Sequence, residues 1–415
     1  MLAKRIFRRV AQSPLKNLDI KRQLNYLERE NIRRKFDKKP LEQTQFNFMN
    51  VISTGINLNA IECYKFPQTP TGPDQNTAKN SFMKVVLPFE TNKEFAALVK
   101  LFYANKMRIG KLLEVMDFVA AGVCYSHLSV LGDHDYTVVT ACIDSFQIFE
   151  ESYNLDENLN IEAYLSYVGN RTMEVQVNVN NSSEKLLMSV NFLFVAKSPS
   201  QHGKSIPSLD IDNDEEPEKA RLLFELGKQN QKRRIEEAKT SSLKVPPTQV
   251  EMQELHKLLL SDIENPSEPH LKMCNTVHKK TELSHHADRN VHGTVFGGTL
   301  MKESYELAFI TAYMLSDGNK PVLQHINDTQ FYSPVPTGAV LNYTSMVNFI
   351  HDTYLSVNVA IDVIEKFENT TTQKHTNDFN VVFDIGKSFG TLMPTTYKDA
   401  MLYVQGKRKF THWLN

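Results

Sequence analysis

The chain has 415 residues, enough for two or three domains that each bury a core. Its 47 lysine and arginine residues are balanced by 48 aspartate and glutamate residues, which predicts no binding to nucleic acid. The four cysteines stand at long, irregular spacings that fit neither a disulfide framework nor a metal site. No run of eighteen apolar residues predicts a membrane-spanning helix, so we expect a soluble protein without membrane insertion.

The beginning of the chain is basic and amphipathic. Before the first acidic residue, Asp19, apolar residues are interleaved with five cations: Lys4, Arg5, Arg8, Arg9 and Lys16. This composition is typical of a mitochondrial transit peptide. We predict a transit segment over residues 1–30, import into the mitochondrial matrix, and an N-terminal extension over 31–79. A disordered basic arm that lies on an anionic surface is the alternative.

Residues 80–200 and 281–397 share one order of elements. Apolar residues recur at helical spacing from Leu113 to His127 and again from Leu300 to Ala312. Runs in which apolar and polar residues alternate, as in strands, follow each helix, for example at 175–179 and 355–363. The chain therefore looks duplicated, with one long helix and several antiparallel strands in each half.

The segment between the halves, residues 201–280, reads as a charged linker. It contains an acidic run from Asp210 to Glu218, a charged helical stretch from Glu218 to Lys239, and the helix breaker Pro246-Pro247. We interpret residues 398–415 as a C-terminal tail. The predicted fold class is α+β, in which a curved antiparallel sheet wraps around the long helix of each half.

A glycine-rich stretch runs from Arg289 to Met301 directly into the second helix. The adjacent Gly297 and Gly298 open that helix, where another backbone or a ligand can approach closely. The first N–H groups of a helix carry partial positive charge and suit a carbonyl oxygen that gains negative charge. A tight, purely structural helix entry is the alternative reading of the glycine pair.

In the first half, Asp117 lies on an apolar helical face with Leu113, Ala120 and Cys124. A carboxylate in such a place is destabilising unless it is paired or hydrogen-bonded, and its perturbed pKa would make it a candidate general base. The alternative is a local cap or a salt bridge.

Residues Asn290 to Met301, together with Glu306-Leu307-Ala308, resemble the signature of the acyl-CoA thioesterase hotdog family, and the resemblance covers both halves. It implies a tandem (double) hotdog that hydrolyses acyl-CoA to a fatty acid and CoA without a cofactor. It also implies a homo-oligomer, most simply a trimer of double hotdogs.

The family's site residues carry over to both halves of the chain. Asp117 falls seven residues after Gly110, the offset that the family's catalytic aspartate has from its second glycine, and Asn290 falls on the catalytic asparagine. The resemblance implies that Asp117 activates water and that Asn290 orients water or the carbonyl. N–H groups near Gly297 and Gly298 would bind the oxyanion. His292 is given a supporting role in the same loop.

The chain departs from the family pattern at the reciprocal positions. Tyr305 stands where the second helix would carry its own catalytic aspartate, and Glu306 is turned to another face. The first half has the single Gly110 and no asparagine eight residues before it. We therefore predict one working site per chain.

Other enzyme classes have sequence motifs that can be checked in this chain. The chain has no Gly-x-Ser-x-Gly elbow, no phosphate-binding or dinucleotide-binding glycine loop, and no histidine cluster at metal-ligand spacing. A hotdog enoyl-CoA hydratase and a non-catalytic acyl-CoA-binding protein stay open as alternatives. The sequence does not fix the preferred acyl chain length.

Overall fold

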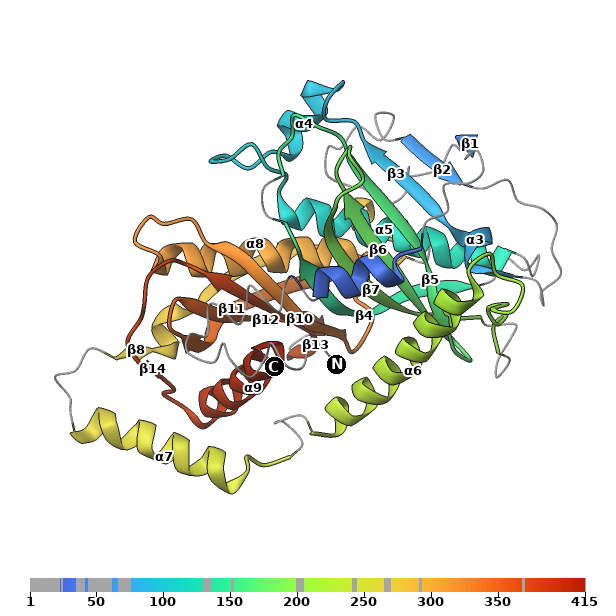
Figure 1. Ribbon diagram of the computed structural model, residues 1–415. Coiled ribbons are helices and arrows are strands. Elements are labelled where there is room, and N and C mark those ends of the chain that lie inside the picture. Colours follow the sequence, from blue (N-terminus) through green and yellow to red (C-terminus); the bar gives the residue numbers. More distant parts are fainter. Residues whose placement is uncertain are drawn as a thin grey trace, which may run out of the picture.

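The computed structural model describes residues 23, 25–34, 42–43, 62–65, 76–129, 136–150, 153–198, 205–240, 245–264, 270–290, 293–367 and 370–414 (Figure 1). The predicted transit segment up to residue 22 lies outside the described residues. Within them, no helix is long and apolar enough to span a membrane.

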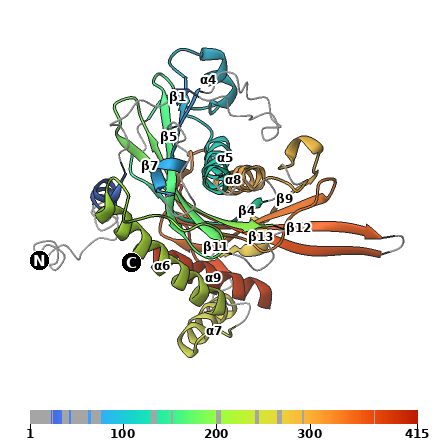
Figure 2. The ribbon, with the colours of Figure 1, turned by 90° about the vertical axis from the view of Figure 1, so that its right-hand side faces the viewer.

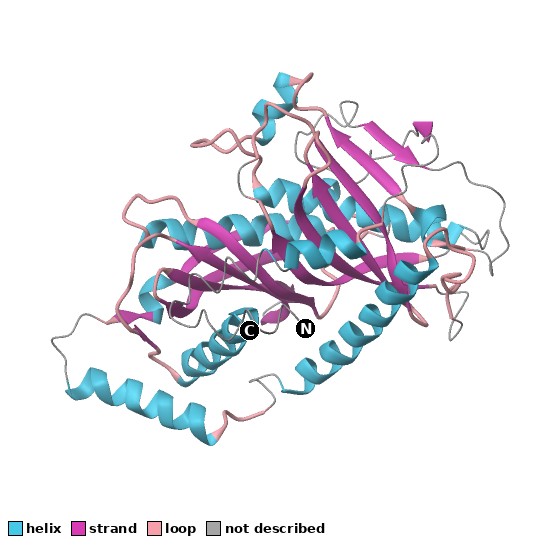
Figure 3. Ribbon diagram, viewed as in Figure 1, coloured by secondary structure: helices cyan, strands magenta, loops and turns pink. Residues whose placement is uncertain are grey.

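Antiparallel strands and long helices make up the described chain (Figure 3). The main sheet contains β1 (Glu42–Gln43), β2 (Glu62–Lys65), β3 (Met83–Leu87), β4 (Thr137–Ile148), β5 (Leu159–Val168), β6 (Thr172–Asn180), β7 (Leu186–Lys197), β9 (His278–Leu283), β10 (Val322–Phe331), β11 (Val340–His351), β12 (Tyr354–Phe367) and β13 (Thr370–Asp384). A small parallel pair is formed by β8 (Leu271–Lys272) and β14 (Leu392–Met393). The helices are α3 (Ala78–Ser81), α4 (Lys93–Val99), α5 (Ile109–Leu128), α6 (Pro217–Thr240), α7 (Gln249–Glu264), α8 (Gly297–Leu315) and α9 (Tyr397–Leu414), with 3-10 turns at Met273–Thr276 and His286–Asp288.

The order of strands in the main sheet is mirrored about its centre. Strands β3-β5-β6-β7-β4 are followed across the sheet by β10-β13-β12-β11-β9, so each strand of the first half has a counterpart in the second. The halves join where β4 pairs with β10, at Phe146–Ile326 and Ile143–Thr329. The predicted mixture of helix and antiparallel sheet is confirmed, as are the helices and the strands expected at 175–179 and 355–363.

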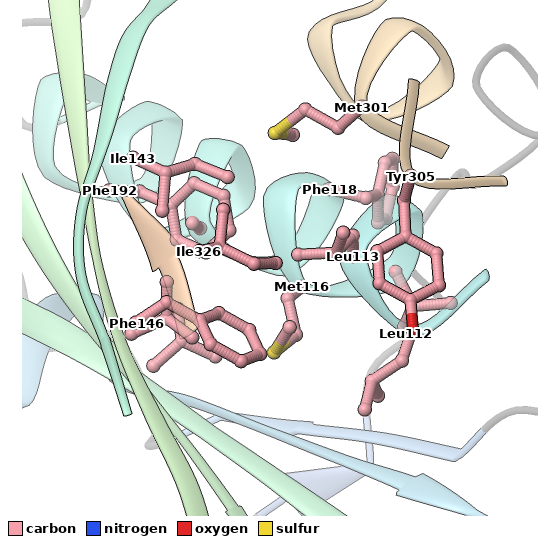
Figure 4. Packing of buried hydrophobic residues seen from close by; sticks show 14 of the residues in the cluster. Leu112, Leu113, Met116, Phe118, Ile143, Phe146, Phe192, Met301, Tyr305 and Ile326 are labelled. Atoms are coloured by element: carbon pink, nitrogen blue, oxygen red, sulfur yellow. The ribbon is translucent and has the colours of Figure 1, made fainter. Parts of the chain in front are cut away.

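Helices α5 and α8 lie side by side in the hollow of this sheet (Figure 2). Each begins with a close approach to the other: Gly110 faces the Lys302 backbone, and Gly298 faces the Glu114 backbone. A side chain at either glycine would force the helices apart. Figure 4 shows the core that they share with the central strands, where Met116 of α5 points toward Phe146 of β4.

The outer face of the first half is also covered. On β6, inward valines alternate with Glu174, Gln176 and Asn178, yet these polar side chains are buried too. They are buried because α6 and the helical residues 25–32 pack over them, and Ser166 and Asn230 satisfy Glu174 by hydrogen bonds. Alternation predicts the strand correctly but does not reveal this second layer.

The helical residues 25–32 end in two buried arginines. Arg33 pairs with Glu162 of β5, and Arg34 pairs with Asp214. Both guanidinium groups are almost fully buried. The last residues of the predicted transit segment, from 25 to 30, and the two arginines after it therefore pack on the folded body.

The predicted linker helix is confirmed as α6, which packs on β5. Its Arg233 and Arg234 both pair with Asp144, which is buried in β4. Residues expected to form a C-terminal tail form most of α9, and Phe410 of this helix packs on Phe349 of β11. Strand β9 begins at His278, so its first three residues fall inside the range predicted for the linker.

Candidate active site

The first turn of α8 meets the middle of α5 without side chains between them. A Cβ at Gly298 would lie 2.9 Å from the Glu114 Cα, and a Cβ at Gly297 would lie 3.2 Å from Asp117 Oδ2. The Gly-Gly pair is therefore required by close packing, and it brings the amino end of α8 against the carboxylate of Asp117.

Asp117 is completely buried. Its Oδ1 accepts a hydrogen bond of 2.9 Å from the Thr140 hydroxyl, and the backbone N–H of Gly298 also interacts with the carboxylate. Burial raises the pKa of Asp117 from its ordinary 3.8 to about 7; the contacts with Thr140 and Gly298 oppose this rise, and nearby Glu114 adds to it. Among the described residues, Oδ2 has no hydrogen-bond partner. Such a carboxyl group can take up a proton near neutral pH.

Asn290 stands at the start of the loop that leads into α8. Its Nδ2 donates to Thr294 Oγ1 at 2.8 Å, and its Oδ1 accepts from the Thr294 backbone N–H at 3.2 Å. The Asn290 backbone N–H also donates to the Thr294 carbonyl at 2.7 Å. The side chain therefore holds a tight turn whose residues line a cavity.

The cavity has a volume of about 440 Å³ and lies between the carboxyl-terminal part of α5, β4, β7, the loop before α8 and the loop after β10. Its walls are mainly apolar and aromatic: Phe118, Ala121, Gly122, Tyr125, Val138, Val139, Ala141, Phe194, Val195, Val295, Phe296, Leu300, Phe331, Tyr332, Pro334 and Val335. Thr140, Asn290, Thr294, Gly297 and Ser333 supply polar or backbone groups, and Lys197 is the single charged residue of the lining.

The structure brings most of the expected residues together. Asn290, Gly297 and Thr140 line the cavity, and Asp117 lies behind this lining, where its carboxylate accepts the hydrogen bond from Thr140. His292 lies outside the described residues. Thr140 could not be identified from the sequence, because no pattern links a threonine on β4 to an aspartate 23 residues earlier on α5.

The reciprocal positions on the other side of the helix pair differ in chemistry. Helix α5 begins at Ile109 and α8 at Gly297, 188 residues later, so Tyr305 corresponds to Asp117. Phe118 and Phe296 contact each other edge to face, with ring centroids 6.4 Å apart. The residues at the equivalent positions, Glu306 and Arg108, form an ion pair.

No group of three or more metal-ligating side chains that could hold an ion occurs in the described part of the chain.

Comparisons with known proteins identify similar sequences. No family model matches the chain. It is 29% identical over 354 residues to mitochondrial acyl-coenzyme A thioesterase 9 of Mus musculus, covering 80% of this chain and 77% of that protein. The Homo sapiens protein of that name is 29% identical over 349 residues, with the same shares covered.

Solved structures give more distant likenesses. An acyl-CoA hydrolase from Staphylococcus aureus, in complex with butyryl coenzyme A, coenzyme A and coenzyme A disulfide, is 26% identical with a TM-score of 0.32 over 35% of this chain and 90% of that chain. An acyl-ACP thioesterase from Bacteroides thetaiotaomicron is 10% identical with a TM-score of 0.44 over 74% of this chain and 99% of that chain.

Proposed function

We propose that this chain, which belongs to the acyl-CoA thioesterases, hydrolyses acyl-CoA to a free carboxylic acid and CoA at a single site shared by its two halves. Each half would be a hotdog, with α5 or α8 as its central helix. The observation that carries the site is the contact between Asp117 of the first half and the amino end of α8 from the second.

Asp117 is proposed as the general base. With a pKa of about 7, its carboxylate can accept a proton from water at neutral pH while the water oxygen attacks the thioester carbonyl carbon. The unpartnered Oδ2, which faces Gly297, is the oxygen available to that water. Thr140 would hold the carboxylate in orientation through Oδ1. The tetrahedral intermediate then expels CoA as a thiolate, and the proton returns to its sulfur.

The oxyanion is proposed to bind at the start of α8. The first N–H groups of a helix have no intrahelical acceptor and carry the positive end of its dipole. Since the Gly298 N–H already interacts with Asp117, the N–H of Gly297 is the better donor for the carbonyl oxygen. Asn290, whose loop lines the same cavity, would orient the water or the carbonyl, and His292 would support that loop.

Cellular setting and assembly are part of the proposal. The basic amphipathic start of the chain and the mitochondrial relatives support import into the mitochondrial matrix. A trimer of double hotdogs is the assembly that we propose, with acyl-CoA as the ligand and no cofactor.

The test is release of free thiol from acyl-CoAs by the full chain. Asp117→Asn keeps the shape of the side chain and removes the base, so we expect turnover to be lost while acyl-CoA still binds. Tyr305→Phe, the matched change on the counterpart helix, should keep turnover. Equal activity in Asp117→Asn and wild type would refute the site. Tight acyl-CoA binding by a wild-type chain that releases no thiol would favour a binding protein instead.

A further inference from the structure

Part of the polar lining of the cavity comes from the loop before α8 and from the segment after β10. Asn290 and Thr294 lie in that loop, and Ser333, in that segment, has a buried hydroxyl without a hydrogen-bond partner among the described residues. The pantetheine arm of CoA carries amides, which need such partners when they leave water. These groups therefore suit the CoA side of the thioester.

The wall along α5 is mainly apolar, and Lys197, the charged residue of the lining, lies next to it opposite Thr137 on the neighbouring strand. Ala121 lies one helical turn beyond Asp117, and Tyr125 lies one turn further, so this wall extends roughly 12 Å from the carboxylate. Phe118 and Phe194 form its sides. The Tyr125 hydroxyl is already engaged, since it accepts a hydrogen bond from the Val138 N–H at 3.2 Å. An alkyl chain fits along this wall better than a chain with amides.

The duplicated half shows what a large side chain does at the position of Ala121. Ala121 is twelve residues after the first residue of α5, and Phe309 is twelve residues after the first residue of α8. The ring of Phe309 stacks between Tyr103 and Tyr313, with centroid distances of 6.1 and 6.2 Å. It also meets Phe383 edge to face at 6.1 Å. The space beside α8 is thus filled with aromatic rings.

We infer that Ala121 is a specificity-determining residue whose small side chain sets how long an acyl chain the site accepts. This inference rests on the proposed function and adds the direction of the substrate. The acyl chain runs from Asp117 along α5 past Ala121, and the pantetheine arm leaves toward Asn290 and Ser333.

The experiment compares kcat/KM for acetyl-, butyryl-, octanoyl-, dodecanoyl- and palmitoyl-CoA in wild type, Ala121→Leu and Ala121→Phe. Because added methylene or ring volume excludes distal carbons, we expect the ratio of long-chain to short-chain kcat/KM to fall about tenfold or more. Ala121→Leu keeps the test valid if the larger phenylalanine prevents folding. Ile310→Phe adds similar bulk to a half-exposed position on α8 and should leave the ratio unchanged.

Acyl thioesters of N-acetylcysteamine, which lack most of the pantetheine arm, decide the direction of the substrate. We expect the Ala121 variants to discriminate by chain length with these substrates as they do with CoA esters. The Ala121 variants could instead lose kcat/KM equally for every CoA ester and lose none for the N-acetylcysteamine esters. That result would place pantetheine beside Ala121 and overturn the inference. An unchanged ratio in both variants would also overturn it. Absence of thiol release from every substrate by wild type would instead refute the proposed function.

Discussion

Asp117→Asn should stabilise the protein in alkaline solution while it abolishes turnover. In the folded chain, burial raises the pKa of Asp117 from 3.8 to about 7, so the native state holds this proton more tightly than the unfolded state does. Between these two values, stability therefore falls as the pH rises, by up to about 1.4 kcal/mol per pH unit. Above the pKa of about 7, Asp117 is charged in the folded chain, and the free-energy cost of burying that charge lowers stability by its full amount.

Asparagine is neutral throughout this range and fits the same contacts. Its Oδ1 can accept the hydrogen bond from the Thr140 hydroxyl that Oδ1 of Asp117 accepts in the wild type. The variant should therefore gain roughly 3 kcal/mol of unfolding free energy relative to wild type between pH 5 and pH 8. Turnover should fall about a hundred- to ten-thousand-fold, the usual contribution of a positioned base.

The assay is urea unfolding of both proteins at each pH from 5 to 8, with thiol release measured on the same samples. The kcat/KM of wild type should rise with pH through about 7, because the base must be ionised. A variant whose stability relative to wild type does not change with pH would refute the reasoning, because it would mean that Asp117 titrates near its ordinary value.

Two further substitutions test the surroundings of the site, and two deletions test the N-terminal segment. Thr140→Val removes a hydrogen bond that lowers the pKa of Asp117, so the midpoint of the pH profile of kcat/KM should move upward and the rate at neutral pH should drop about tenfold. Gly298→Ala places a Cβ against the Glu114 backbone, so calorimetry should show a lower Tm and thiol release should be largely lost. Deletion of residues 1–22 should leave Tm unchanged, whereas deletion of 1–40 should lower it strongly. The longer deletion removes Arg33 and Arg34 and leaves buried Glu162 and Asp214 without them, at about 3–5 kcal/mol for a broken buried pair. Equal Tm values for the two truncated chains would contradict the conclusion that Arg33 and Arg34 stabilise the folded chain.

Periodicity and local chemistry predicted the parts of the fold that lie close together in sequence. The helical spacing of apolar residues located α5 and α8, and the glycine pair located the amino end of α8. These signals arise from contacts within one element or at its ends, so a single sequence contains them.

Contacts between elements far apart in the sequence could not be predicted in this way. Thr140 lies on β4, whose pairing with β7 shifts register between Thr140 and Cys142, so alternation cannot say which face the threonine occupies. Arg34 reads as one more charge in a basic segment, and only the fold brings it to Asp214. The contrast between Ala121 and Phe309 likewise depends on the fold, because rings from other segments surround Phe309.

The two halves have diverged at several positions at once, which predicts that one substitution will not restore a second site. Tyr305→Asp would supply an acid at the counterpart of Asp117, but Phe102 stands eight residues before Gly110, and the Arg108–Glu306 ion pair replaces two phenylalanines. Phe309 also fills the neighbouring space. The double variant Asp117→Asn/Tyr305→Asp should therefore stay as inactive in thiol release as Asp117→Asn alone. Recovery of turnover in the double variant would show that the acid by itself decides which half of the chain is catalytic.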